Sequence, residues 1–120
     1  MTKKILICDD EEGIRESLKL ILSDYYSMIV TDSSQQCLDC IENDPQIGLV
    51  LIDIKMPQVS GIDTLKVIKE KYPKLPVIMV TGYKSVETAA EAAKLGASGY
   101  IVKPFKSEEI LEKVGKFVGR

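Results

Sequence analysis

The chain has no histidine and no tryptophan among its 120 residues. The missing histidine excludes imidazole acid–base catalysis, Ser-His-Asp and Cys-His nucleophile arrangements, and histidine-containing metal sites. Only 6% of the residues are aromatic, and the net charge of −2 is not accompanied by a Lys/Arg stripe, which argues against direct nucleic-acid binding. Whatever chemistry the chain performs must therefore use carboxylates, lysine, hydroxyls, thiols or tyrosine.

Long apolar segments and phosphate-binding glycine motifs are also missing. No apolar run approaches the ~20 residues of a membrane-spanning helix, and the N-terminus lacks the apolar segment and cleavage site of a secretory signal. Neither the P-loop motif nor the dinucleotide-binding glycine motif is present. With 45% hydrophobic and 28% charged residues, we expect one globular domain over residues 1–120, cytoplasmic and without membrane contact.

Short apolar runs alternate with amphipathic segments along the whole chain. The apolar runs predict strands at residues 4–8, 28–31, 48–52, 76–80 and 99–102. Helices are expected at residues 12–22, from a cap at Ser33 or Ser34 to Pro45, at 62–71, at 86–95, and onward from a cap at Ser107. Apolar strands that alternate with helices indicate a parallel sheet covered on both faces. The fold class is therefore α/β, in three layers with five strands and five helices.

The residues that follow the strands carry the candidate chemistry, because ligands of open parallel sheets bind beyond the carboxyl ends of the strands. These residues are Asp9-Asp10-Glu11-Glu12, Asp53, Thr81-Gly82 and Lys103-Pro104. Several carboxylates at one edge repel one another unless a hard cation such as Mg²⁺ is bound between them. A Mg²⁺ site beside an aspartate, a lysine and a threonine suits phosphoryl transfer to the aspartate.

In their order and spacing, these residues resemble those of a bacterial two-component response-regulator receiver domain, over essentially all of the chain. The matching pieces are Asp9-Asp10, Asp53 with Met56-Pro57 and Gly61, Thr81-Gly82, and the run from Gly96 to Phe105. The resemblance implies a flavodoxin-like sheet with strand order 2-1-3-4-5. It also implies a site between the ends of the first and third strands.

The resemblance assigns the metal site and the acceptor. Asp53 would be the phosphoacceptor. Mg²⁺ would be held by Asp53, by Asp9 or Asp10 or both, and by the main-chain carbonyl of Lys55.

The resemblance also implies a switch. Thr81 and Lys103 would bind the phosphoryl group, with a cis bond before Pro104 that aims the lysine. Tyr100 would turn inward when Thr81 moves, which changes the surface of the fourth helix, fifth strand and fifth helix.

Lys55 and Tyr83 are two further residues expected to flank the phosphoryl group. A long cation and an aromatic ring would crowd the approach of water, so we predict a comparatively long-lived phosphorylated form with slow self-dephosphorylation.

The resemblance places the missing histidine on a partner, which would be a sensor histidine kinase or a histidine phosphotransfer protein. An output domain or downstream partner and a phosphorylation-dependent homodimer are further expectations. Residues 61–83 are similar both to receivers that precede ATPase-type transcription activators and to stand-alone relay receivers. The chain would be a signalling switch that catalyses only its own phosphorylation and dephosphorylation.

Other interpretations of the same residues remain. Asp10 or Glu11 alone could serve as a helix cap. A Mg²⁺-dependent phosphatase would also use an aspartate nucleophile, but Ile54-Lys55 follow Asp53 without the second acid of such enzymes. A degenerate receiver used only as a scaffold would not need the intact acids, threonine and lysine. Cys37 and Cys40 form a CxxC motif, for which core packing is favoured over a metal or redox site, and Cys8 is expected as core.

Overall fold

The computed structural model describes residues 3–56, 58–82 and 84–119, in which five strands and five helices alternate. The strands are β1 (Lys4–Cys8), β2 (Ser27–Thr31), β3 (Ile47–Ile52), β4 (Val77–Thr81) and β5 (Gly99–Val102). The helices are α1 (Glu12–Leu22), α2 (Ser34–Asn43), α3 (Gly61–Lys71), α4 (Val86–Lys94) and α5 (Ser107–Val118). No helix within these described ranges has both the length and the apolar character needed to cross a membrane.

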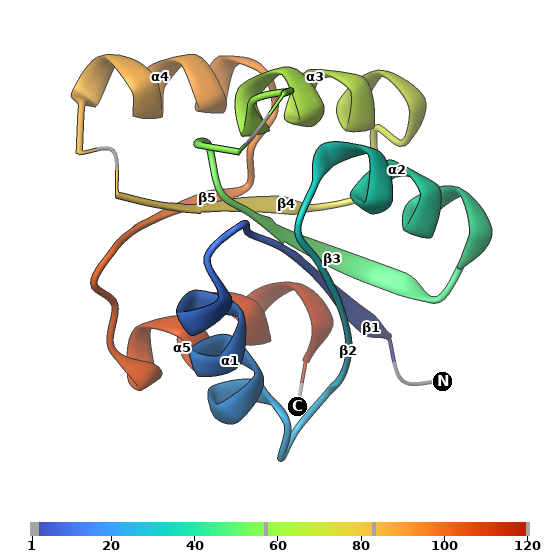
Figure 1. Cartoon of the computed structure of the whole chain (residues 1–120), viewed down its shortest axis with the longest axis vertical. Coiled ribbons are helices and arrows are strands. Elements are labelled where there is room, and N and C mark those ends of the chain that lie inside the picture. The colour runs from blue at the N-terminus through green and yellow to red at the C-terminus, as the bar shows by residue number, and fades with distance from the viewer. Residues whose placement is uncertain (1–2, 57, 83, 120) are drawn as a thin grey trace.

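The strands form one parallel sheet in the order β2-β1-β3-β4-β5, so the predicted flavodoxin-like topology is confirmed. Helices α2, α3 and α4 cover one face of the sheet, and α1 and α5 cover the other (Figure 1). The order of the strands reverses between β1 and β3, which leaves a crevice at their carboxyl ends where no helix passes directly from one strand to the other.

Alternation along the strands divides the core in two. Ile5 and Ile7 of β1 belong to the cluster under α1 and α5, whereas Leu6 and Cys8 belong to the cluster under α2, α3 and α4. Both faces of the central strands are therefore buried from solvent, which is why β1, β3 and β4 are continuous apolar runs in the sequence. This packing fixes the positions of the residues that follow each strand.

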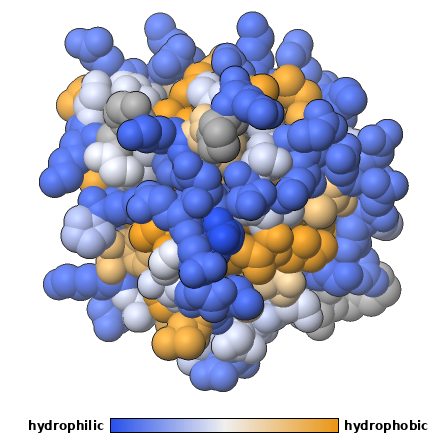
Figure 2. All heavy atoms as spheres, viewed as in Figure 1, coloured by the Kyte–Doolittle hydropathy of each residue, from blue (hydrophilic) through white to orange (hydrophobic). Residues whose placement is uncertain are grey.

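Helix α4 is the most loosely attached of the covering elements. Ala92 is its only buried residue, whereas its first residue, Val86, is 83% exposed. Leu20 of α1 is exposed to a similar extent. In the view of Figure 1, most side chains on the surface are hydrophilic, and hydrophobic side chains are exposed in patches between them (Figure 2).

The structure decides between the two predicted caps of α2 and corrects two other predicted helix ends. The side chain of Ser33, and not that of Ser34, caps α2, because Ser33 Oγ accepts a hydrogen bond from Gln36 N while Ser34 is buried inside the first turn. The cap position of α5 is Lys106, with no side-chain hydrogen bond, so the predicted Ser107 cap is wrong. Helix α2 already ends at Asn43, before Pro45.

The cysteines are all free. Cys8 and Cys37 are fully buried in the cluster under α2, and Cys40 packs at its border. Burial raises the pKa of the Cys40 thiol, which disfavours the reactive thiolate. The predicted packing role of the CxxC motif agrees with this arrangement.

Candidate functional site

Two buried carboxylates lie side by side where β1 and β3 end. Asp9 and Asp53 are 2% and 3% exposed. The backbone fixes their spacing, because Asp53 N donates to the carbonyl of Cys8 at 3.0 Å. One oxygen of each carboxylate accepts a nearby backbone N–H: Asp9 Oδ1 from Glu11 at 2.9 Å, and Asp53 Oδ1 from Lys55 at 3.3 Å.

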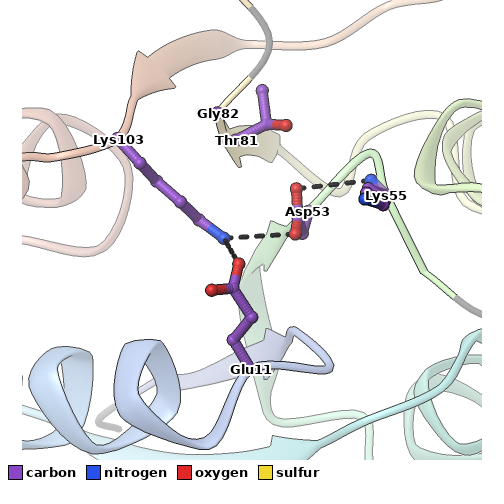
Figure 3. A pocket seen from close by; sticks show the side chains of 6 residues that line it. All are labelled: Glu11, Asp53, Lys55, Thr81, Gly82 and Lys103. Atoms are coloured by element: carbon purple, nitrogen blue, oxygen red, sulfur yellow. Dashed lines mark hydrogen bonds and ion pairs between the residues drawn. The ribbon is translucent and has the colours of Figure 1, made fainter.

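Lys103, just after β5, inserts its ammonium group among these acids (Figure 3). Its Nζ lies 2.9 Å from Asp9 Oδ2, 3.1 Å from Asp53 Oδ2 and 2.9 Å from Glu11 Oε1. Lys103 N donates to the carbonyl of Thr81 at 2.8 Å, which ties the end of β5 to the end of β4. The peptide bond between Lys103 and Pro104 is cis, the isomer that the resemblance implies.

Burial and the neighbouring charges shift the pKa values of two of these residues, Asp9 and Lys103. Burial raises the pKa of the Asp9 carboxyl, and the Glu11 N–H and the contact with Lys103 only partly offset this effect. Burial also disfavours the charge of Lys103, but its contacts with Glu11, Asp9 and Asp53 outweigh this effect and raise its pKa above the usual range. The lysine is therefore charged at neutral pH.

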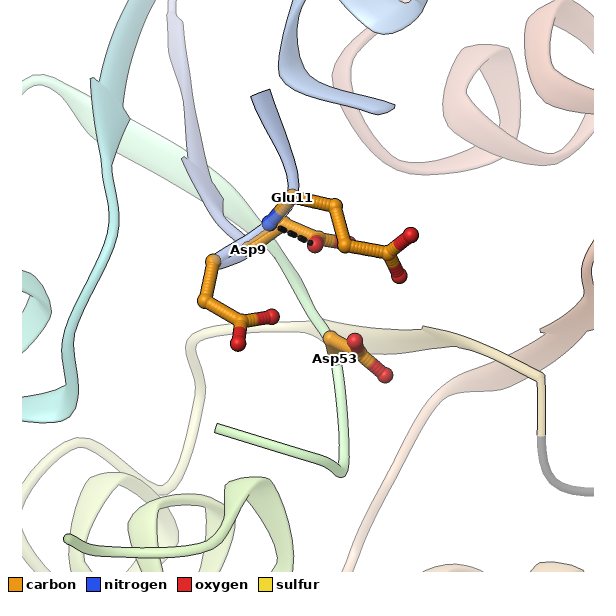
Figure 4. Close-up of side chains that lie close together, drawn as sticks. Asp9, Glu11 and Asp53 are labelled. Atoms are coloured by element: carbon orange, nitrogen blue, oxygen red, sulfur yellow. Dashed lines mark hydrogen bonds between the residues drawn. The ribbon is translucent and has the colours of Figure 1, made fainter. Parts of the chain in front are cut away.

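The acids form a set of oxygen ligands suitable for a divalent cation. Asp9, Asp10, Glu11 and Asp53 each offer an oxygen, and these atoms lie within 4.8 Å of one another. Figure 4 shows Asp9 and Glu11 close to Asp53. The buried Asp9 Oδ2 accepts no hydrogen bond from the described residues and only makes the ion pair with Lys103. One ammonium group cannot balance four carboxylates, and a carboxylate-rich oxygen site of this kind fits Mg²⁺.

A cleft of about 350 Å³ opens above Asp53. It is lined by Glu11, Asp53, Lys55, Thr81, Gly82 and Lys103 (Figure 3). Thr81 is the last residue of β4 and is fully buried, while Lys55 is exposed at the rim. The cleft thus brings a carboxylate, a hydroxyl and two lysines around a space large enough for a phosphoryl group.

Tyr100 lies in β5, beside a second cavity of about 210 Å³. The rest of that cavity is lined by small residues of α4 and the turn that follows, among them Ala89, Ala92 and Ala97. Burial raises the pKa of the Tyr100 hydroxyl, and the charge of Asp53 adds to this effect. Tyr100 therefore faces a cavity beside α4 and is close enough to Asp53 for the charge of that carboxylate to affect its hydroxyl.

Most of the predicted site residues come together in this structure. Asp9, Asp10 and Asp53 share one cluster, with Lys103 in contact with two of them. Tyr83 lies outside the described residues. Other predicted members line the cleft or its neighbouring cavity: Lys55, Thr81 and Tyr100.

Glu11 is the residue that the sequence prediction missed. The sequence places Glu11 in the acidic run after the first strand and offers it as a helix cap, but gives its side chain no partner in the site; its backbone does occupy the cap position of α1. Its side chain makes no capping hydrogen bond and instead pairs with Lys103 across the site. The signal was present in the sequence, as a third acid beside Asp9 and Asp10, but side-chain direction at a helix start does not follow from spacing.

Comparison with known proteins identifies the family. The family model of the response regulator receiver domain matches residues 5–115. The chain belongs to this family. Receiver domains act in phosphoryl-transfer signalling, bind Mg²⁺, and work with histidine kinases and output domains.

Curated relatives of this receiver domain are longer proteins. It is 33% identical over 117 residues to the response regulator protein FleR of Pseudomonas aeruginosa, covering 97% of this chain and 24% of FleR. It is 38% identical over 110 residues to the putative response regulator NtrX-like of Rickettsia bellii, covering 89% of this chain and 23% of that protein. The receiver domain thus spans about a quarter of the length of these relatives.

Solved receiver domains have the same fold. The CheY-like response regulator receiver domain protein of Methanospirillum hungatei superposes with a TM-score of 0.90 at 36% identity, covering 97% of this chain and 93% of that one. NtrX from Brucella abortus, in complex with ADP, gives 0.89 at 33% identity and covers 97% of this chain and 27% of that one. The BeF3-activated DrrB receiver domain gives 0.88 at 27% identity, with full coverage of both chains.

Proposed function

We propose that Asp53 accepts a phosphoryl group from a phosphohistidine of a sensor histidine kinase or a histidine phosphotransfer protein. The observation that carries this proposal is the environment of the carboxylate. Asp53 lies at the base of the cleft, 3.1 Å from Lys103 Nζ and within a cluster of acids that fits a divalent cation. Thr81, a hydroxyl donor, lines the same cleft.

Phosphorylation would proceed as a direct displacement. A carboxylate oxygen of Asp53 attacks the phosphorus, the phosphorus–nitrogen bond of the donor breaks, and the imidazole leaves with the electron pair. Lys103 stabilises the negative charge on the phosphoryl oxygens, and the Thr81 hydroxyl donates a hydrogen bond to one of them. The Lys55 N–H on Asp53 Oδ1 holds the carboxylate in a fixed orientation during the attack.

Mg²⁺ would be held by oxygens of Asp9, Asp10 and Asp53 and by the main-chain carbonyl of Lys55. When bound, the ion neutralises charge on the carboxylates and on the phosphoryl group. Support comes from the four-acid cluster and from the buried Asp9 Oδ2, for which the described part of the chain provides only the ion pair with Lys103.

Hydrolysis returns the domain to its starting state. Water attacks the phosphorus of the phosphoaspartate, the bond to the Asp53 oxygen breaks, and phosphate leaves. Lys55 at the rim of the cleft limits the access of that water and makes this step slow. In this scheme the domain catalyses only its own phosphorylation and dephosphorylation, and it acts on no other substrate.

The output would be a change in the surface formed by α4, β5 and α5. Thr81 moves toward the phosphoryl group and Tyr100 turns inward to fill the space. The cavity of about 210 Å³ between Tyr100 and the alanines of α4 supports this step. Val86 of α4 and Phe117 of α5 are exposed hydrophobic side chains on this surface, as expected for a docking face or a phosphorylation-dependent homodimer.

The donor would dock beside the cleft, on α1 and the segment after β5. A cavity there is lined by Leu20, which is 81% exposed, and by Phe105. Phe105 lies two residues after Lys103 in the sequence. The relatives ZraR and CpxR of Escherichia coli are transcriptional regulatory proteins, so an attached output domain and a cytoplasmic location are further parts of this proposal.

The test is phosphorylation of the purified protein by acetyl phosphate, followed by intact mass. With Mg²⁺ present we expect a gain of one phosphoryl group in the natural protein and none in Asp53→Asn. The variant Asp63→Asn, which neutralises an exposed acid on α3, serves as the matched control and should be phosphorylated normally. Phosphorylation of Asp53→Asn to the same extent, or no dependence on Mg²⁺, would refute the proposal.

A further inference from the structure

A pair of buried hydroxyl groups joins α2 to α3 next to the site. Ser34, the first residue of α2, is 4% exposed, and Thr64 in the first turn of α3 is fully buried. Their oxygens lie 2.6 Å apart. Thr64 Oγ1 also donates to the carbonyl of Ser60 at 2.9 Å, so its proton is committed there and Ser34 is the donor of the shorter bond.

From Thr64, the contacts lead to the backbone of Asp53. The Ser60 carbonyl also accepts from Thr64 N at 3.0 Å, so Thr64 holds the start of α3 by two hydrogen bonds. Gly61, which follows Ser60, donates its N–H to the carbonyl of Ile54 at 2.7 Å. A Cβ atom at Gly61 would come within 1.9 Å of the Asp53 carbonyl oxygen, so the start of α3 lies directly against the acceptor residue.

From Ser34, the contacts lead to the other buried acid. The carbonyl of the preceding residue, Ser33, lies 3.3 Å from Cys8 Sγ, which is equally close to Met56 Sδ and can donate its one proton to either atom. Cys8 is followed by Asp9, and its own carbonyl accepts the Asp53 N–H at 3.0 Å. The contacts therefore close a ring through β1, the start of α2, the start of α3 and the end of β3.

We infer that the Ser34–Thr64 hydroxyl pair is a positioning element that sets the separation of the Asp9 and Asp53 carboxylates. The inference rests on the proposed function, since those carboxylates are the proposed Mg²⁺ ligands. A buried hydroxyl pair is directional, whereas two apolar side chains here would pack without fixing one relative position of the helices. The pair would thus act on Mg²⁺ binding through the backbone, since neither hydroxyl belongs to the acidic cluster that would hold the ion.

Mg²⁺ binding to the full chain is the measurement that tests this inference, by titration with MgCl₂ and NMR detection of amide shifts around Asp9 and Asp53. Ser34→Ala removes the link but leaves Thr64 bonded to Ser60, and Thr64→Val removes both bonds with little change of shape. Mutation of a residue that is hydrogen-bonded to a metal ligand typically weakens metal affinity about 10–100-fold. Ser34 and Thr64 act on the ligands only through the intervening backbone, so we expect the Mg²⁺ Kd to rise less, about three- to tenfold, in each variant. Thr64→Ser keeps the hydroxyl and should restore the affinity.

Controls separate positioning from stability. Val114→Ala creates a cavity on the opposite face of the sheet, so it lowers the stability without touching the ring. Its Kd should stay within about twofold of the parent, and the double variant Ser34→Ala/Thr64→Val should bind no more weakly than Thr64→Val, because the two changes remove one shared link. Parent-like Kd values in both single variants, or an equal loss of Mg²⁺ affinity in Val114→Ala, would overturn this inference but not the proposed function. Failure of the parent to bind Mg²⁺ near Asp9 and Asp53 would overturn the proposed function and the inference together.

Discussion

Neutralising Asp53 should stabilise the folded protein when no divalent cation is present. Its carboxylate lies 3.1 Å from Lys103 Nζ, an attraction of about 5 kcal/mol at an effective dielectric constant of about 20. The Asp9 carboxylate lies within 4.8 Å, a repulsion of about 3.5 kcal/mol on the same scale. Asp10 and Glu11 add repulsion that solvent screens, and burial of the charge adds a further cost. We expect these three unfavourable contributions together to exceed the attraction to Lys103.

We therefore expect Asp53→Asn to raise the free energy of unfolding by about 1 kcal/mol in EDTA, measured by urea unfolding and circular dichroism at 25 °C. Added Mg²⁺ should reverse the order of stability. At a concentration 100 times its Kd, an ion that binds only the folded state stabilises the natural protein by about 2.7 kcal/mol. Asp53→Asn lacks one charged ligand and should gain much less.

The control variant is Glu112→Gln, which makes the same charge change at an exposed position of α5. Its stability should stay within about 0.5 kcal/mol of the parent, both with and without Mg²⁺. If Asp53→Asn is less stable than the parent in EDTA, the proposed balance of charges is incorrect. An equal gain from Mg²⁺ in parent and variant would show that the ion binds elsewhere.

Three further predictions concern the same site. Lys55→Asn should speed the loss of the phosphoryl group several-fold, because it opens the rim of the cleft to water, and an unchanged rate of phosphate release would contradict this role. Because burial raises the folded-state pKa of Asp9, its carboxyl holds a proton to higher pH than in the unfolded chain, so without Mg²⁺ its contribution to stability is lost as the pH rises through that pKa. Mg²⁺ competes with the same proton, so the apparent Mg²⁺ affinity should begin to fall at a higher pH than it would for an aspartate of ordinary pKa. A flat titration profile would exclude Asp9 as a ligand. Gly61→Ala should abolish phosphorylation and lower stability, since its Cβ would overlap the backbone of Asp53. The Cβ of the control variant Gly13→Ala in α1 would meet nothing within 4 Å, and the change should stabilise the protein by up to about 1 kcal/mol through helix propensity. Equal urea midpoints for the two variants would refute this prediction.

The sequence predicts the fold well because the strands are buried on both faces. Runs such as residues 48–52 are apolar throughout, which separates them from the amphipathic helices by period alone. The ends of parallel strands meet at one edge, so Asp9, Asp53 and Lys103 could be placed together without any structure. Helix starts were less predictable, because Ser33 and Ser34 have the same capping chemistry and only packing decides which one is buried.

Contacts between distant side chains could not be predicted. Ser34 and Thr64 are 30 residues apart, and each alone is an ordinary polar residue near the start of a helix. Their pairing depends on how closely α2 and α3 approach, which periodicity does not determine. The direction of the Glu11 side chain toward Lys103 depends in the same way on the position of β5 beside the site.

The weak attachment of α4 has a consequence for the time course of signalling. A helix that contributes one buried alanine to the core forfeits little apolar contact when it lifts from the sheet, so its amide protons should exchange with solvent sooner than those of β3 or β4. We therefore expect the displaced conformation to be populated to a small extent before any phosphoryl group arrives. In that case, phosphorylation of the acidic site would shift the population among conformations that the unphosphorylated protein already adopts. Helix α4 would be the element that changes position, because its displacement loses the least buried apolar contact.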